Sequence, residues 1–209
     1  MAMEDASSPT MRSVDEFEGG FGWIESGFLE RASHVIVVDG AAWLVDPLAA
    51  DGLEERIRAA GRPAGVIQLL DRHDRDCAAL AERLSVPHHV VPFAGVEGSP
   101  FSFRRVLRLP GWREVALWWP EGRVLACADA LGTASYFRAA GERLGVHPFL
   151  RLLPPRAMAR ALTPTHVLCG HGEGIHGDGA AFQLERALAT SRRRSPHWLV
   201  TQIRRKKDS

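Results

Sequence analysis

Short apolar runs separated by turn residues recur along the chain and predict β-strands. Residues 34–38 and 41–45 form two such runs that meet at Asp39-Gly40, and this pair favours a β-hairpin because both residues tolerate positive φ. Residues 64–70 have the length and composition of a buried strand. Further strands are predicted in HHVVPF, SFRRVLRLPG, REVALWWPEGRVLACAD and THVLCGHG, the third of which contains a hairpin.

Amphipathic segments follow several of these strands and predict helices. In residues 51–61, Asp51 suits the N-cap position, and Glu54 three residues later suits a capping box. Other helices are predicted in RDCAALAERL, ASYFRAAGERLG, LRLLPPRAMARAL, GDGAAFQLERALAT and SPHWLVTQIRRKK. This order of elements favours an α/β fold with a two-sheet core and helices outside.

The length of 209 residues suits one domain of ordinary size. Residues 1–20 are polar and acidic and are predicted to form a flexible N-terminal tail. Residues 21–209 are predicted to form a single domain that ends in a basic helix. The N-terminus lacks the basic start and apolar run of a signal peptide, and no window approaches the ~18 apolar residues of a membrane span.

Composition excludes several classes of protein and function. The chain is 45% hydrophobic and 24% charged, as expected of a globular protein with a substantial core. Its net charge of +1 provides no overall field that would attract nucleic acid or an acidic substrate. The 3 cysteines are widely spaced and suit neither a disulfide framework nor a zinc site. A reducing, cytoplasmic setting is therefore expected.

Ionisable residues follow three of the predicted strands. The segments are VIQLLDRHDRD, RVLACADALGT and THVLCGHGEGIHGD. Because neighbouring strand ends bring sequence-distant side chains together, we expect their acids and histidines to converge. The candidates are Asp71, His73, Asp76, Asp129 and His171. Carboxylates and imidazoles form a ligand set that suits Zn, Mn or Fe.

These segments, in this order, resemble the metallo-β-lactamase superfamily, and its hydroxyacylglutathione-hydrolase-like members more than those that degrade antibiotics. The resemblance covers roughly residues 35–189 and includes the early hairpin ending in LVDP. It implies a four-layer αββα sandwich with the active site at the sheet edges. The family motif His-x-His-x-Asp-His, a further His, a bridging Asp and a last His there hold two metal ions.

The family's metal motif is only partly present in DRHDRD. Asp71 stands at the first His, and His73 keeps the second. Arg75 stands at the metal-binding Asp, and Asp76 stands at the final His. An arginine side chain stays charged and repels a second metal ion, so we hypothesise that Arg75 replaces that cation and pairs with Asp76 or with Asp129. Arg75 and Asp76 are therefore the predicted catalytic residues.

The other family ligands fall in the later segments. Trp112 stands where a third His is expected, whereas Asp129 keeps the bridging Asp and His171 keeps the last His. The resemblance thus implies one metal ion at most, with ligands drawn from Asp71, His73, Asp129 and His171. Taken one at a time, these residues also suit surface ion pairs, helix caps and structural histidines.

Three functions follow as alternatives. The first is a divergent metal-dependent hydrolase of a small ester or thioester. The second is a metal-free module of the same fold that binds a small molecule or another partner. The third is nucleic-acid binding through basic residues near the C-terminus, which are Arg192, Arg193, Arg194, Arg204, Arg205, Lys206 and Lys207. No membrane partner is expected, and the sequence predicts no oligomeric state.

Overall fold

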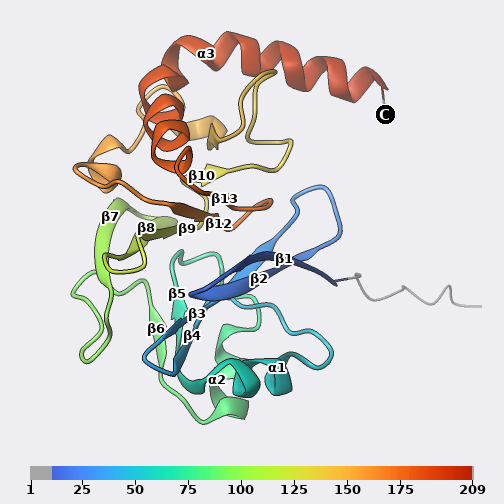
Figure 1. Cartoon of the computed structure of the whole chain (residues 1–209). Helices are drawn as coiled ribbons and strands as arrows, with labels where there is room; N and C mark the ends of the chain where they lie inside the picture. The colour runs from blue at the N-terminus through green and yellow to red at the C-terminus, as the bar shows by residue number, and fades with distance from the viewer. Residues whose placement is uncertain (1–10, 209) are drawn as a thin grey trace, which may run out of the picture.

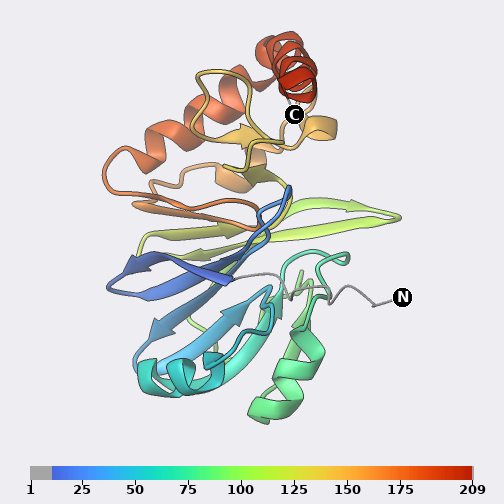
Figure 2. The same ribbon diagram turned by 90° about the vertical axis from the view of Figure 1, so that its right-hand side faces the viewer.

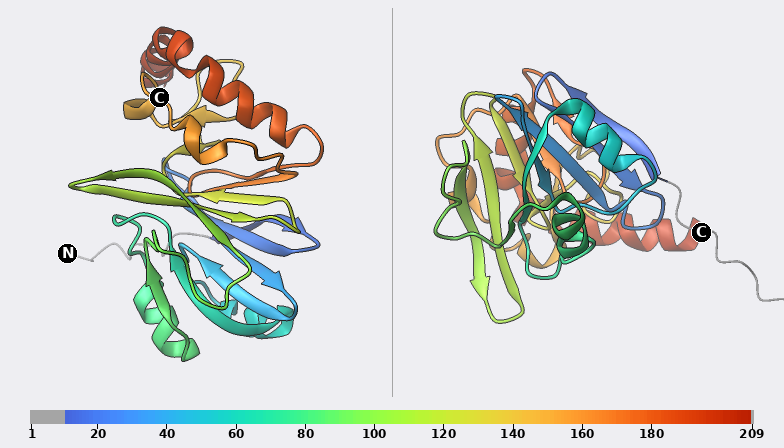
Figure 3. Two further views of the ribbon diagram at one scale, coloured as in Figure 1. Left: turned by 90° about the vertical axis from the view of Figure 1, so that its left-hand side faces the viewer. Right: turned by 90° about the horizontal axis from the view of Figure 1, so that it is seen from below.

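Two β-sheets stacked face to face form the centre of the molecule, with helices on both outer sides (Figure 1). The computed structural model describes residues 11–208. The layers run from α1 and α2, through a six-stranded and then a five-stranded sheet, to α3 (Figures 2 and 3). This arrangement confirms the predicted αββα sandwich.

The six-stranded sheet has the order β1-β2-β3-β4-β5-β6. Its first four strands are antiparallel, and β5 and β6 continue it in parallel, with α1 and α2 as the intervening helices. The predicted hairpin is confirmed, because Asp39 and Gly40 both have positive φ between β3 and β4. The elements are β1 Met11–Phe17, β2 Gly20–Glu25, β3 Ala32–Val38, β4 Ala41–Val45, α1 Leu53–Ala60, β5 Arg62–Gln68, α2 Cys77–Leu84 and β6 His88–Val90.

The five-stranded sheet has the order β13-β12-β9-β8-β7. Strands β7, β8 and β9 form an antiparallel meander, and β12 lies parallel to β9. Its strands are β7 Ser102–Leu109, β8 Trp112–Trp119, β9 Val124–Cys127, β12 His166–Cys169 and β13 Ile175–His176. The remaining elements are β10 Leu131–Gly132, β11 Gly145–Val146, the 3₁₀ helices η1 Pro148–Leu150 and η2 Arg156–Ala159, and α3 Ala180–Asp208.

Alternating side chains of the strands build separate core layers. Val115 and Leu117 of β8 pack between the sheets, while Ala116 and Trp118 face the α3 side. Successive strand residues point to opposite faces, so a strand buried on both sides needs a continuous apolar run, as β8 has. Among residues 11–208, no helix has the length and apolar composition that a bilayer crossing requires.

The predicted tail is wrong in its second half, because Met11–Phe17 is strand β1, paired antiparallel with β2. The strand is mostly polar and buries Val14, so its hydrophobic pattern is weak. Asp15 compensates for this. Its carboxylate accepts the Gly174 amide at 2.7 Å and bonds His176 at 2.9 Å and His34 at 3.0 Å. Residues 1–10 lie outside the described part of the chain.

We expect Asp15→Asn to lower the free energy of unfolding by about 3 kcal/mol at pH 7. Burial opposes ionisation, but His176 and His34 outweigh it and hold the pKa of Asp15 well below its ordinary value of 3.8. The stability that Asp15 contributes is therefore complete above pH 3.8 and is lost as the pH falls. Urea unfolding at pH 7 and pH 3 should show the difference between variant and wild type shrinking by about 1 kcal/mol. An equal difference in unfolding free energy at pH 7 and pH 3 would contradict this role of the Asp15 carboxylate. Asp51→Asn, at an exposed position, serves as the control.

The helices predicted in residues 134–145 and 150–162 are wrong. These segments form turns, β11, η1 and η2. Tertiary bonds override their helical pattern, since buried Arg151 donates to the Phe137 carbonyl and to Glu142. The two predicted C-terminal helices are one helix, α3, with Pro196 inside it.

Candidate metal centre

Three of the predicted ligands converge at the edge of the two sheets. His73 lies in the loop between β5 and α2, Asp129 follows β9, and His171 follows β12. Cys127 and Cys169 are register partners in the parallel pair β9 and β12, so Asp129 and His171, two residues further on, leave the sheet side by side. One ligand atom from each of the three residues lies within 4.8 Å of the others.

A single carboxylate oxygen lies between the two histidines. Asp129 Oδ1 is 3.0 Å from Nε2 of His73 and 3.0 Å from Nε2 of His171. The outer nitrogen of each ring faces an acceptor. His73 Nδ1 lies 2.9 Å from Asp46 Oδ2, and His171 Nδ1 lies 2.8 Å from the Leu29 carbonyl oxygen. Both Nδ1 atoms therefore carry the proton and donate it outward.

This tautomer suits the centre to a proton or a metal ion. With Nδ1 protonated, each neutral ring turns the lone pair of Nε2 toward the anionic oxygen of Asp129, and such an arrangement is repulsive. It is balanced either by a proton on each Nε2 or by one metal ion among the three atoms. Metal-binding histidines are held in the same way, with the far N–H bonded to a carboxylate or a backbone carbonyl. The donor set thus fits a divalent ion such as Zn, Mn or Fe.

The pKa values of Asp129 and His73 are shifted in the directions that favour an anion beside a cation. Burial opposes ionisation of Asp129, but hydrogen bonds from His171 and His73 outweigh it and hold the pKa of this carboxyl far below its usual range. Burial and the nearby Arg75 oppose protonation of His73, but Asp46 and Asp129 outweigh them and raise its pKa. Both shifts show that the centre favours positive charge beside Asp129.

The second oxygen of Asp129 is held by Arg72. The Arg72 guanidinium donates to Asp129 Oδ2 at 2.9 Å and lies 4.5 Å above the Trp112 ring. Trp112 in turn donates to the buried Glu114 carboxyl at 2.9 Å, and burial raises the pKa of Glu114 to about 7. Trp112, at the position of a missing ligand, thus forms a wall of the site and supports Arg72.

Arg75 is half-buried, and its guanidinium binds backbone carbonyls. Its guanidinium donates to Ala32 at 2.5 Å, to Asp46 at 2.8 Å and to Gly170 at 3.0 Å, so it joins both sheets beside the centre. Arg75 has a φ of 38°, a left-handed conformation that is uncommon for a residue with a side chain. Burial lowers its pKa. The expected ion pair of Arg75 with Asp76 or Asp129 is wrong. Arg72 forms the ion pair with Asp129, and Asp76 accepts the Ala49 amide.

The other two predicted acids lie outside the three-residue group. Asp76 accepts the Ala49 amide at 2.7 Å. Asp71 accepts the Arg113 amide at 3.1 Å through Oδ2, while its buried Oδ1 has no hydrogen-bond partner among the described residues. Neither carboxylate reaches the three converging atoms, and that of Asp76 is engaged by the backbone amide of Ala49, 27 residues away.

Sequence reasoning did not predict the roles of Asp46 and Arg72. Asp46 ends the LVDP segment and orients His73, and it also accepts the Leu69 amide at 2.8 Å. Its position at a strand end was a usable signal. Arg72 is adjacent to His73 in DRHDRD, but the sequence does not tell which of its arginines reaches Asp129.

Solved structures of low sequence identity share this fold. No family model matches the sequence, and no curated protein does either. The metallo-β-lactamase of Hirschia baltica has a TM-score of 0.59 at 11% identity, covering 90% of this chain and 98% of that one. That of Erythrobacter litoralis has a TM-score of 0.57 at 14% identity, with coverages of 88% and 92%. That of Pontibacter korlensis has a TM-score of 0.54 at 10% identity, with coverages of 86% and 99%. The chain thus has the metallo-β-lactamase fold.

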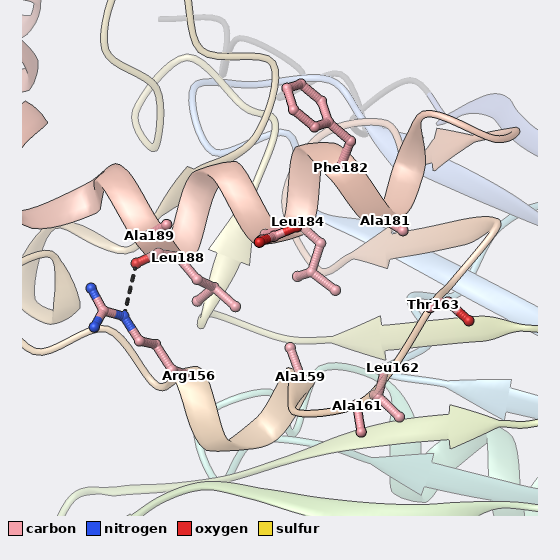
Figure 4. Close-up of a pocket in the computed structure, with 11 residues that line it drawn as sticks. Arg156, Ala159, Ala161, Leu162, Thr163, Ala181, Phe182, Leu184, Leu188 and Ala189 are labelled. Atoms are coloured by element: carbon pink, nitrogen blue, oxygen red, sulfur yellow. Dashed lines mark hydrogen bonds between the residues drawn. The ribbon is translucent and has the colours of Figure 1, made fainter.

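A groove of about 470 Å³ between η2 and α3 is separate from this centre (Figure 4). Leu184 and Leu188 of α3 face Ala159 and Leu162 across it, and Arg156 donates to the Leu188 carbonyl. None of His73, Asp129 and His171 lines the groove, and its walls are mainly aliphatic.

Proposed function

We propose that this protein is a metal-dependent hydrolase of a small ester or thioester, with one divalent ion held by His73, Asp129 and His171. The observation that carries the proposal is the convergence of two Nε2 atoms on one carboxylate oxygen, with both Nδ1 protons held from outside. Resemblance to the hydroxyacylglutathione-hydrolase-like branch supports an ester or thioester as the substrate.

The chain's own residues would prepare the centre. Asp46 and the Leu29 carbonyl orient the two imidazoles, and Arg72 holds the second oxygen of Asp129 so that Oδ1 faces inward. A divalent ion at such a site acts as a Lewis acid toward water and a substrate carbonyl. Asp71 lies outside the converging atoms, so water or substrate would complete the ligand set. Arg75 would act by positioning Gly170, next to His171, and not by contact with substrate.

The alternative is a metal-free binding module of the same fold. The Arg72–Asp129 ion pair favours it, because a guanidinium already neutralises part of the charge that a metal would neutralise. The nucleic-acid alternative has less support, since Arg194 and Arg205, two of the basic residues of α3, bond to Glu142 and to the Ser135 carbonyl.

Ester and thioester hydrolysis tests this proposal. Protein freed of metal with a chelator and reloaded with Zn, Mn or Fe(II) should hydrolyse a member of a panel of 4-nitrophenyl esters and acyl thioesters. Asp129→Asn should lower kcat/KM by more than about 100-fold, because the amide removes the negative charge shared by both histidines. His197→Ala, an exposed histidine of α3, should keep full activity. Activity that persists in Asp129→Asn, or that no metal restores, would contradict the proposal.

A further inference from the structure

A cavity of about 670 Å³ lies between the loop that precedes β3, the segment after β10, and the C-terminal half of α3. This volume is within the range of small-molecule sites. The residues that line it are Phe28, Ser135, Tyr136, Trp198, Gln202, Arg205 and Lys206. None of them was a candidate for substrate binding in the sequence, apart from the general basic character of the C-terminus.

Two chain segments connect the cavity lining with residues that contact the metal centre. Phe28 directly precedes Leu29, whose carbonyl oxygen lies 2.8 Å from His171 Nδ1. Tyr136 directly precedes Phe137, whose ring stacks on His171 with centroids 5.3 Å apart. Two residues of the lining are thus chain neighbours of residues that contact His171, on the outer side of its ring.

The walls of the cavity are aromatic. The centroid of the Tyr136 ring lies 5.9 Å from that of Phe28 and 6.3 Å from that of Trp198. The Trp198 indole N–H also donates to the Tyr136 carbonyl at 2.7 Å. Phe28 is 70% exposed, so part of its ring is available to a ligand. Aromatic side chains arranged in this way favour an apolar, preferably aromatic, guest.

The charge of the cavity has one sign. Among the described residues that line it, Arg205 and Lys206 are charged and none is an acid. Arg205 donates to the Ser135 carbonyl, which places its positive charge at the wall, and Lys206 is exposed at the rim. A guest that carries a negative charge is thus favoured over a neutral one of the same shape.

We propose that this cavity binds the aromatic, anionic part of the substrate, so that the substrate class is an aryl ester or thioester that carries a carboxylate or a similar anion. The assignment of this ligand as a substrate rests on the proposed hydrolase function. Binding in the cavity itself does not need the metal.

Calorimetric titration of chelator-treated protein with 2-naphthylacetate and with its neutral amide tests the cavity separately from hydrolysis. The carboxylate should bind at least about tenfold more tightly than the amide. Lys206→Glu should weaken carboxylate binding at least about tenfold and leave amide binding unchanged. Lys207→Glu makes the same charge change one residue further along α3, outside the cavity lining, and should cost much less.

A second pair of variants tests the aromatic wall. Phe28→Ala should weaken both probes about fivefold or more, whereas Phe182→Ala, an exposed phenylalanine at the other end of α3, should not. Equal affinities for carboxylate and amide, no binding of either probe, or equal effects of the Lys206 and Lys207 variants would overturn the proposal. Probe binding with this pattern in a protein that hydrolyses no ester would support the cavity and reject the hydrolase.

Discussion

Replacing Arg75 by methionine is expected to lower the free energy of unfolding by at least about 3 kcal/mol. The guanidinium donates to three backbone carbonyls, of Ala32, Asp46 and Gly170, which belong to both sheets. Methionine fills a similar volume but donates no hydrogen bond. The Asp46 carbonyl keeps the Ser33 hydroxyl and the Gly170 carbonyl keeps the Ala32 amide, so what is lost is the charged donor at each of the three carbonyls. A hydrogen bond from a charged donor contributes about 1.5–3 kcal/mol, and a domain has about 5–15 kcal/mol in total.

Urea unfolding followed by circular dichroism measures the effect, and Arg83→Met is the matched control. Arg83 pairs with Glu54 on the surface at 2.8 Å, and such pairs contribute about 0–1 kcal/mol. If Arg75→Met and Arg83→Met lose the same small amount, Arg75 does not join the sheets as described. If Arg75→Met does not fold, Arg75→Lys should fold with reduced stability, since lysine keeps a charged donor at the site.

The second large effect is expected on metal affinity. His171→Ala should weaken binding of Zn by more than about 100-fold, since loss of even an outer-shell partner of a ligand costs about 10–100-fold. The variant removes one of three converging atoms, so two ligands are left on the chain's triad. Competition with a chromophoric chelator gives the affinity.

His197→Ala and Asp76→Asn are the controls for this measurement. His197 is exposed on α3, and Asp76 accepts the Ala49 amide outside the triad. Both variants should bind Zn as wild type does. A loss in Asp76→Asn equal to that in His171→Ala would instead place Asp76 among the ligands.

The sequence predicted the sheets better than the segments between them. Apolar runs bounded by turn residues identified most strands, including β3 and β4 around Asp39-Gly40 and the doubly buried β8. It failed where contacts distant in sequence decide the structure. Buried Arg151 and its partner Glu142 hold residues 134–162 in turns, and Asp15 holds a polar edge strand in place. The local hydrophobic periodicity of the sequence predicts neither pairing.

At the site, residues at strand ends were predictable and their detailed pairing was not. His73, Asp129 and His171 follow β5, β9 and β12, and the structure brings them together. Which arginine of DRHDRD binds Asp129 depends on the backbone of that loop, where Arg75 has positive φ and turns toward the carbonyls. The aromatic cavity is assembled from Phe28, Tyr136 and Trp198, which are far apart in sequence and form no motif.

Elemental analysis of untagged wild-type protein tests whether His73, Asp129 and His171 hold one divalent ion. After incubation with Zn, Mn or Fe(II) and gel filtration, we expect about one equivalent of metal per chain, because three ligand atoms lie around one point. No bound metal under any of these conditions would rule out this metal centre. It would mean that protons on both Nε2 atoms balance Asp129 and that the protein is a metal-free binding module.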